Sequence, residues 1–335
     1  MIFLADLPAP SRMGDILMAF LSIVFEGAPY ILIGTIFSGF IDAFLPAKLL
    51  DRVLPKSKVL ATLIAGFLGL VFPVCECAVV PVIRRLVQKG LPLSCAVTYM
   101  LSAPIMNPIV AISTLTAFKE FQDLSWATAG NATMTIARLS LGYLVAVIVG
   151  LVVLRFKPGQ VLRHSIANKI ENAAAEDDHG HVHAPAASFN GKLVHAMRSS
   201  MRDFLDTAMY FAIGVAITSV FNTQLDQSNT DTQLMLKTIA SSDWLAIPFL
   251  MGLAILLSLC STSDAFIAAP MTAFSMAAKL AFLVFGPMMD IKLLFMYSSV
   301  FQRKVVVCLL VGLFLLVGLL SGPWMSLVQH LYIKP

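Results

Sequence analysis

Charged side chains are scarce in this sequence. Asp, Glu, Lys and Arg make up 13% of the 335 residues, whereas about 25% is usual in soluble domains. Hydrophobic residues make up 58%, and the mean hydropathy is +0.85. Several apolar runs reach the roughly 20 residues that a helix needs to cross a bilayer. The composition therefore excludes an ordinary soluble protein and predicts an all-α, multi-pass protein of the cell inner membrane.

Signatures of common enzymes are also missing. The sequence has no Gly-Lys-Ser/Thr phosphate loop, no Ser/His/Asp arrangement and no metalloprotease motif. We therefore expect no enzyme, no ATP hydrolysis and no resident cofactor. Residues 1–12 lack the features of a removable signal peptide. The net charge of +4 lies mostly in loops, where it indicates membrane orientation rather than a nucleic-acid partner.

Cysteine is rare as well. The chain has five cysteines, an odd number, and all lie in or beside apolar segments. This pattern argues against a disulfide framework and favours free thiols or thiolate ligands.

Apolar runs and their interruptions predict the helices. Long helices are expected at residues 13–45, 92–118, 126–155, 200–222, 280–301 and 305–322. Two further runs, 59–88 and 243–278, carry Gly, Pro or polar residues at their centres, where a spanning helix should be most apolar.

The first interrupted run is predicted to be a re-entrant hairpin. It is flanked by basic loops at residues 46–58 and 84–90. If residues 59–81 crossed the membrane, these loops would lie on opposite sides, against the positive-inside rule. A hairpin with its tip at residues 75–77 keeps both loops cytoplasmic; an ordinary spanning helix is the alternative.

The two halves of the chain resemble each other. Residues 26–34 align with 206–214 at an offset of 180, whereas 69–77 align with 252–260 and 103–107 with 286–290 at an offset of 183. Three crossings and one hairpin per half would turn the second half upside down, as in many secondary transporters. We therefore expect two inverted repeats, each with three spanning helices and one re-entrant helical hairpin. The expected segments are a first repeat at 1–156, a cytoplasmic linker at 157–199 and a second repeat at 200–335.

The triplet Cys75-Glu76-Cys77 lies at the predicted hairpin tip. An intramembrane carboxylate is costly and is a functional candidate by default, and thiolates bind soft, thiophilic centres. Cys260 is the repeat counterpart of Cys77, so the two tips predict one substrate site with these four residues. Cys95 and Cys308, alone on apolar helices, are expected to be packing residues.

Pro104 and Asn107 belong to a second candidate feature. Pro104 and Pro108 are expected to break helix 92–118 and free backbone carbonyls, which Asn107 or a substrate would then meet. We include Pro104 and Asn107 among the predicted substrate-binding residues.

Further charged residues lie in apolar surroundings. Protonation of buried acids is the usual chemistry of a proton relay, and a structural role beside a helix break is the alternative. Arg138 is expected to pair with a buried acid or to extend toward the membrane surface, and Arg84, Arg85 and Lys89 to set the orientation. The candidate proton-coupling acids are Glu26, Asp206, Asp264 and Asp290.

Three histidines alternate in the segment DDHGHVHAP, residues 177–185. His179, His181 and His183 would suit zinc or a similar ion. A solvated loop without metal is the alternative.

Three stretches resemble one known family. FPVCECAVVPVIRRLVQKGLP (72–92), LSAPIMNPIV (101–110) and LCSTSDAF (259–266) are similar to the YraQ/ArsP permease family. The best-studied branch of that family exports trivalent organoarsenicals such as methylarsenite.

The resemblance implies a permease that exports a small-molecule or metalloid substrate of thiophilic character. The buried acids named above lead us to expect that export is driven by the proton gradient. The alternatives are a zinc transporter fed by the histidine segment and a membrane-embedded redox protein that uses Cys75 and Cys77. The lipid bilayer is the expected surroundings, nucleic acid is not expected, and a homo-oligomer is left open.

Overall fold

The computed structural model describes residues 12–44, 55, 57–71, 74–120, 127–163, 189–225 and 242–332. Nearly all of these residues are helical, and the described ranges contain no β-strand beyond one isolated bridge between Leu162 and Phe301. The helices of the first half are α1 (Arg12–Phe44), α3 (Lys58–Ala65), α4 (Leu68–Val71), α5 (Glu76–Gln88), α6 (Leu93–Ser102), α7 (Pro108–Glu120), α8 (Ala127–Val153) and α9 (Pro158–Val161). Those of the second half are α11 (Phe189–Leu225), α13 (Asp243–Leu257), α14 (Asp264–Ala268), α15 (Met276–Met288), α16 (Ile291–Ser298) and α17 (Arg303–Tyr332).

Helix length and composition confirm a polytopic membrane protein. Five stretches in the described ranges are long and apolar enough to cross a membrane. These stretches are Ile16–Phe40, Thr133–Val153, Ala196–Val220, Met276–Ser298 and Arg303–Leu331.

The structure corrects one predicted helix. The apolar run 280–301 is interrupted, because α15 ends at Met288 and α16 begins at Ile291. Asp290 is extended and its Oδ1 accepts a 2.7 Å hydrogen bond from the backbone N–H of Leu293. A side chain that caps the next helix in this way competes with continuation of the previous one. The break predicted in 92–118 is present, between α6 and α7.

The offset of 183 residues also relates helix boundaries. α6 begins at Leu93 and α7 at Pro108, whereas α15 begins at Met276 and α16 at Ile291. α15 and α16 thus each begin 183 residues after their counterparts, α6 and α7. The two interrupted runs behave alike as well, since 59–88 is divided between α3, α4 and α5 and 243–278 between α13, α14 and the start of α15.

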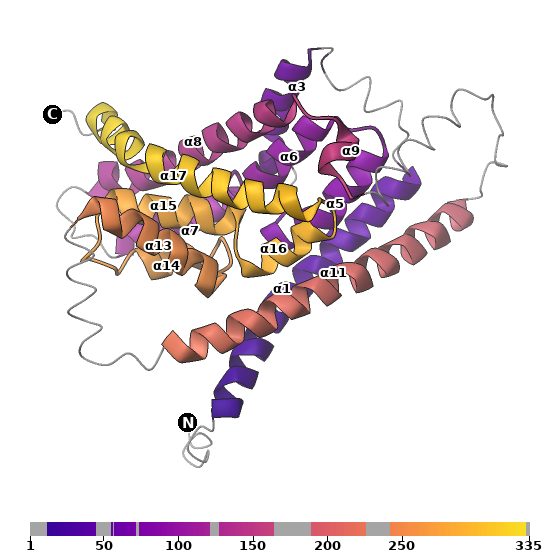
Figure 1. The fold of residues 1–335 in the computed structure, drawn as a ribbon, viewed down its shortest axis with the longest axis horizontal. Coiled ribbons are helices and arrows are strands. Elements are labelled where there is room, and N and C mark those ends of the chain that lie inside the picture. The colour runs from indigo at the N-terminus through magenta and orange to yellow at the C-terminus, as the bar shows by residue number, and fades with distance from the viewer. Residues whose placement is uncertain are drawn as a thin grey trace.

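Helices α1 and α11 form a long pair that runs diagonally across the molecule (Figure 1). α5 packs against α1 at Gly34, where an added Cβ would lie 2.6 Å from the Cβ of Ala78. Because no real Cβ tolerates that approach, only glycine allows α5 to lie this close to α1. The beginning of α5, which carries Glu76, is thereby held against α1.

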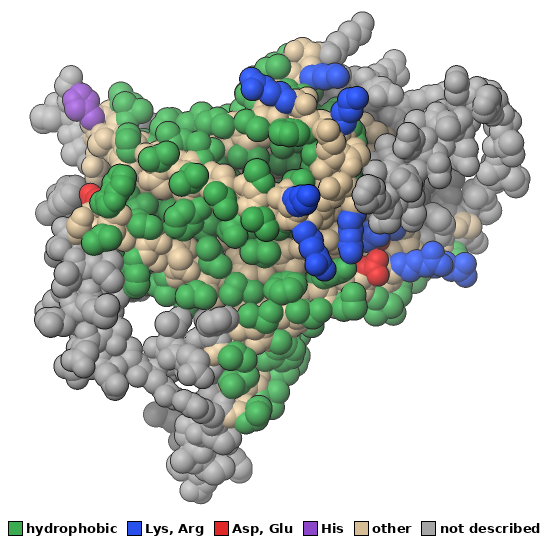
Figure 2. Space-filling model, in the orientation of Figure 1, with side chains coloured by type: hydrophobic (Ala, Val, Ile, Leu, Met, Phe, Trp, Pro, Cys, Tyr) green, Lys and Arg blue, Asp and Glu red, His purple; other side chains and the backbone are tan. Residues whose placement is uncertain are grey.

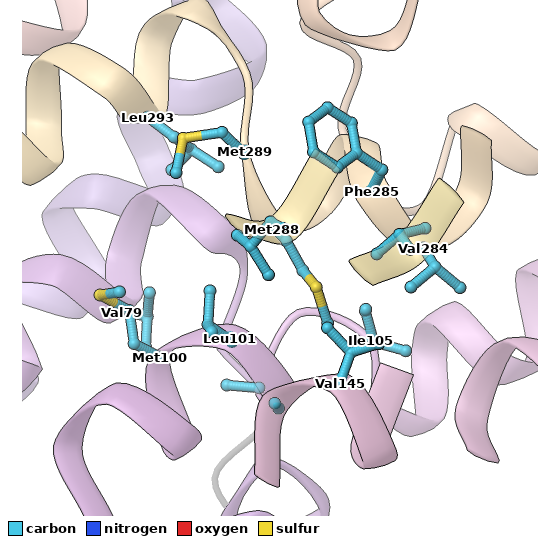
Figure 3. Packing of buried hydrophobic residues seen from close by; sticks show 14 of the residues in the cluster. Val79, Met100, Leu101, Ile105, Val145, Val284, Phe285, Met288, Met289 and Leu293 are labelled. Atoms are coloured by element: carbon cyan, nitrogen blue, oxygen red, sulfur yellow. The ribbon is translucent and has the colours of Figure 1, made fainter. Parts of the chain in front are cut away.

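The hydrophobic core is shared between the two halves. The buried residues form a large cluster that includes members of both halves. Figure 3 shows Met288 of α15 reaching toward Ile105, which lies between α6 and α7, and toward Val145 of α8. The two halves therefore pack as one body around the interrupted helices.

Charge is distributed unevenly over the surface. Figure 2 shows a largely hydrophobic face on which Lys and Arg side chains gather toward one side. Large apolar side chains are exposed along α17, among them Leu315 and Leu319. Such a surface is suited to lipid, with the basic residues at the aqueous boundary.

Candidate functional site

Two helix breaks, one in each half, lie on opposite walls of one cavity. In the first half α4 ends at Val71 and α5 begins at Glu76, with Cys75 as the N-cap residue. In the second half α13 ends at Leu257 and α14 begins at Asp264. The cavity has a volume of about 80 Å³ and is also lined by α1 and α11. Its lining includes Cys75, Glu76, Cys77, Ser258, Cys260 and Lys292.

Glu76 connects the two halves. Its side chain is 1% exposed. Oε1 lies 3.3 Å from the Nζ of Lys292 on α16, and Oε2 accepts a 3.0 Å hydrogen bond from the Oγ of Ser261. A carboxylate at this depth is stabilised only by such partners, because hydrocarbon offers none.

Lys292 gathers oxygen atoms from three segments. Besides Glu76, its Nζ donates to the carbonyl of Ser258 at 3.0 Å and to that of Leu259 at 3.5 Å. The Oδ2 of Asp290 lies 3.5 Å from the same nitrogen. Lys292 is 4% exposed, so its charge is balanced by these groups rather than by water.

Arg138 of α8 forms a second buried ion pair. Its Nη2 donates to Asp264 Oδ2 at 2.6 Å and to the carbonyl of Ser261 at 3.1 Å, and its Nη1 donates to Thr114 at 2.7 Å. The predicted pairing of Arg138 with a buried acid is confirmed. Ser261 contacts both Arg138 and Glu76, and it thereby joins the two ion pairs into a single charged network. We call this set the midplane network, after the place in the membrane that the predicted hairpin tip at residues 75–77 would occupy; it consists of Glu76, Arg138, Ser261, Asp264, Asp290 and Lys292.

All five cysteines are free thiols. Cys75, Cys77 and Cys260 line the cavity, and Cys260 Sγ accepts a 3.4 Å hydrogen bond from Thr262 Oγ1. Cys95 is buried on α6 and Cys308 is exposed on α17, and neither lines this cavity. The structure thus brings the three thiols predicted to act together, with Glu76, to a single place.

Pro104 and Asn107 are placed in the break between α6 and α7. Asn107 is buried, and its Oδ1 accepts a 3.0 Å hydrogen bond from the backbone N–H of Ile109. This contact satisfies a donor at the start of α7. Neither residue lines the cavity.

The remaining predicted residues lie elsewhere or cannot be placed. Glu26 lies on α1 beside Gly27, which lines the cavity, but its side chain is outside the described part of the structure. The Asp206 side chain is 56% exposed and pairs with Arg84 at 3.1 Å. His179, His181 and His183 lie outside the described residues. Within the described ranges, no group of three or more His, Cys, Asp and Glu side chains could hold a metal ion.

A further charged cluster ties three helices together away from the cavity. Arg85 of α5 holds Asp203 of α11 with its Nε at 2.8 Å and its Nη2 at 2.9 Å. Ser38 Oγ of α1 lies 3.1 Å from Asp203 Oδ2 and 3.1 Å from the carbonyl of Pro81. These contacts, together with the Arg84–Asp206 pair, join α5 and α1 to α11.

Sequence reasoning missed two members of the midplane network, Lys292 and Ser261. Lys292 had a usable signal, because it is a basic residue inside the apolar run 280–301, two residues after Asp290. An ionisable residue inside an apolar segment is a candidate for a functional site, and this applies to a lysine as well as to an acid. Ser261 carried no such signal, since serine is common in membrane helices.

Comparisons with known proteins show which family this chain belongs to. The family model ArsP_1, described as "Predicted permease", matches residues 12–322. The UPF0718 protein YcgR of Bacillus subtilis (strain 168) is 36% identical over 306 residues, which cover 90% of this chain and 94% of that protein. A protein of Streptococcus mutans (serotype c) named "Putative two-component membrane permease complex subunit" is 32% identical over 317 residues, 90% of this chain and 97% of its own. No solved structure matches.

Proposed function

Because this chain belongs to the ArsP_1 family of predicted permeases, we propose that the solute it moves across the membrane is small and thiophilic. The proposed substrate class is that of trivalent organoarsenicals such as methylarsenite, and the proposed direction is export. The proposed binding site is the cavity between the two helix breaks.

The observation that carries this proposal is the gathering of three free thiols around one cavity. Cys75, Cys77 and Cys260 come from two distant segments, and sulfur ligands select soft centres over hard ones. Methylarsenite carries two hydroxyl groups on arsenic. Two thiols would replace them, so that two As–S bonds form, two As–O bonds break and each hydroxyl leaves as water with one thiol proton. A third thiol would then allow exchange, in which one As–S bond forms as another breaks.

We propose further that the two halves are inverted repeats with re-entrant hairpins. The equal spacing of helix starts at 183 residues supports this arrangement, as do helix breaks at matching places in both halves. Broken helices that meet at the centre of the membrane are typical of secondary transporters. Three arginines contact α11: Arg84 through Asp206, Arg85 through Asp203 and Arg163 through Tyr210. The end of the molecule that carries these arginines would face the cytoplasm.

Proton coupling is proposed from the charges of the midplane network. Its three carboxylates, on Glu76, Asp264 and Asp290, face two cations, on Arg138 and Lys292. One bound proton would balance these charges, and release of that proton would leave one negative charge beside the cavity. Glu26 is retained as a candidate through its place beside Gly27. Asp206 is a weaker candidate, because its carboxylate is already exposed to solvent and paired.

Transport into everted membrane vesicles tests the proposal. Vesicles that contain the protein should accumulate methylarsenite when their interior is made acidic, so that protons leave as the solute enters, and a protonophore should abolish the accumulation. Vesicles without the protein and parallel assays with Zn²⁺ serve as controls. Uptake of Zn²⁺ but not of methylarsenite would refute the proposed substrate class. Methylarsenite uptake that does not depend on the proton gradient would refute proton coupling.

A further inference from the structure

We propose that Lys292 is a substrate-positioning residue. It ties the second helix break to Glu76 of the first, and it thereby holds Cys260 opposite Cys75 and Cys77 around the cavity. This inference rests on the proposed function in one respect: it takes the three thiols to be the groups that bind the substrate.

The second break depends on Lys292 for its backbone hydrogen bonds. Because α13 ends at Leu257, the carbonyls of Ser258 and Leu259 lie outside a helix. Carbonyls without partners are costly at membrane depth, where no water replaces a missing donor. The ammonium group of Lys292 donates to both carbonyls. Cys260 is the next residue along the chain. Its backbone position is therefore fixed by the hydrogen bonds of Lys292 to the two preceding carbonyls.

The turn that precedes Cys260 is strained. Ser258 has a φ of 46° and is the one non-glycine residue with a positive φ in the described ranges. Such a conformation persists where the surroundings over-determine it, and it often marks a functional segment. Ser258 Oγ donates to the carbonyl of Ile255 at 3.0 Å and accepts from Thr218 of α11 at 3.3 Å, while its carbonyl accepts from Lys292. Removal of the lysine would release the contact that connects this turn to α16.

The other end of the connection is Glu76, which lies between Cys75 and Cys77. The ion pair with Lys292 fixes the side chain of Glu76, and it thereby restrains the backbone that carries Cys75 and Cys77. An ammonium group has three N–H donors, and four oxygen atoms of the protein already surround that of Lys292. Lys292 therefore positions the thiols and does not itself act as a ligand for the solute.

The backbone of Lys292 is placed by a close helix contact. A Cβ added at Gly214 of α11 would lie 2.5 Å from the Cα of Lys292. Alanine at position 214 would therefore displace Lys292 without removing its charge. Gly252 on α13 offers a matched control, because an added Cβ there meets nothing within 4 Å.

Thiol cross-linking tests the positioning directly and needs no substrate. In purified full-length protein that carries Cys75→Ser, Cys95→Ser and Cys308→Ser, only Cys77 and Cys260 remain. Dibromobimane should join these two thiols and become fluorescent. Lys292→Met should lose most of this cross-link, Lys292→Arg should keep it, Gly214→Ala should reduce it, and Gly252→Ala should leave it unchanged. An undiminished cross-link in Lys292→Met would overturn the inference.

Protection of the thiols by methylarsenite separates positioning from a general loss of structure. With all five cysteines present, methylarsenite should slow the reaction of Cys75, Cys77 and Cys260 with maleimide, as measured by mass spectrometry of peptides, because it holds two of the three thiols at a time and exchanges among them. In Lys292→Met, Cys75 and Cys77 should stay protected, because they share one segment, while Cys260 becomes reactive. Protection of Cys260 equal to that in the wild type would contradict the inference. If methylarsenite protects no thiol in the wild type while the cross-link still requires Lys292, the proposed substrate fails and the positioning role stands.

Discussion

The midplane network and the second charged cluster, in which Arg85 holds Asp203 and Arg84 holds Asp206, use the same kinds of side chain in different surroundings. We call the region of this second cluster the basic end. Both join α5 to helices of the second half, the first through Glu76 and Lys292 and the second through Arg85 and Asp203. Every charged side chain of the midplane network is at most 4% exposed, whereas Arg85 is 17% exposed and Asp206 is 56% exposed.

The difference shows how the burial of a charged pair determines its contribution to stability. At the basic end Asp203 is 4% exposed and depends on Arg85 and Ser38, but the Arg84–Asp206 pair is exposed, so water can replace a lost partner there and that pair contributes little to stability. In the midplane network no water replaces it, and a lost partner leaves an uncompensated charge in a medium that stabilises it poorly. The proposed proton coupling would give a reason for retaining buried charges at such cost.

The largest effect on stability is expected from Arg138→Met. This substitution leaves Asp264 buried without its cation, a change that costs about 3–5 kcal/mol of unfolding free energy in comparable buried pairs. The measurement is thermal unfolding of the purified protein in detergent. The double variant Arg138→Met with Asp264→Leu should recover most of the loss, because neither charge is then buried alone. Equal stability of Arg138→Met and wild type would show that this pair is not the buried contact described above.

A smaller effect is expected from Arg85→Met. Asp203 would lose two hydrogen bonds but keep the contact with Ser38, and a buried acceptor that loses its partner costs about 1–3 kcal/mol. The same unfolding assay measures the change, and Arg163→Met, an exposed arginine, provides the control. A loss as large as that of Arg138→Met would remove the contrast between the two regions.

The smallest effect is expected from Asp206→Asn. The pair with Arg84 is largely solvated, so its removal should change the unfolding free energy by less than about 1 kcal/mol. Methylarsenite transport in vesicles should keep its dependence on the proton gradient. Loss of that dependence in Asp206→Asn would return this residue to the coupling site and weaken the case for the midplane acids.

The sequence predicted the features that depend on composition and local chemistry. Low charge and long apolar runs predicted the membrane helices, and prolines predicted the break between α6 and α7. Cys75, Glu76, Cys77 and Cys260 were selected because polar and sulfur-containing residues stood out in apolar surroundings, and the structure places them on one cavity.

What the sequence did not predict depends on three-dimensional contacts. The break before Ile291 forms because Asp290 caps α16, a contact that the sequence does not show. Pro287 and the alignment of 286–290 with 103–107 were the available signals for this break, and the predicted helix 280–301 did not take them into account. The role of Lys292 depends on four oxygen contacts, which come from residues up to 216 positions away in the chain. Asp203 lies among polar residues that give no sign of burial, yet contacts with α1 and α5 bury it.

The central claim, that the cavity between the two breaks binds the transported solute through its thiols, is tested most directly by three serine substitutions. Cys77→Ser and Cys260→Ser should each abolish methylarsenite transport with normal amounts of folded protein in the membrane. The reason is that a hydroxyl group nearly matches the thiol in size but has little affinity for a soft centre. Cys95→Ser, a buried thiol on α6 away from the cavity, should transport like the wild type. Wild-type transport in both Cys77→Ser and Cys260→Ser would show that these sulfur atoms only fill space, and the account of the cavity as a thiol site would be wrong.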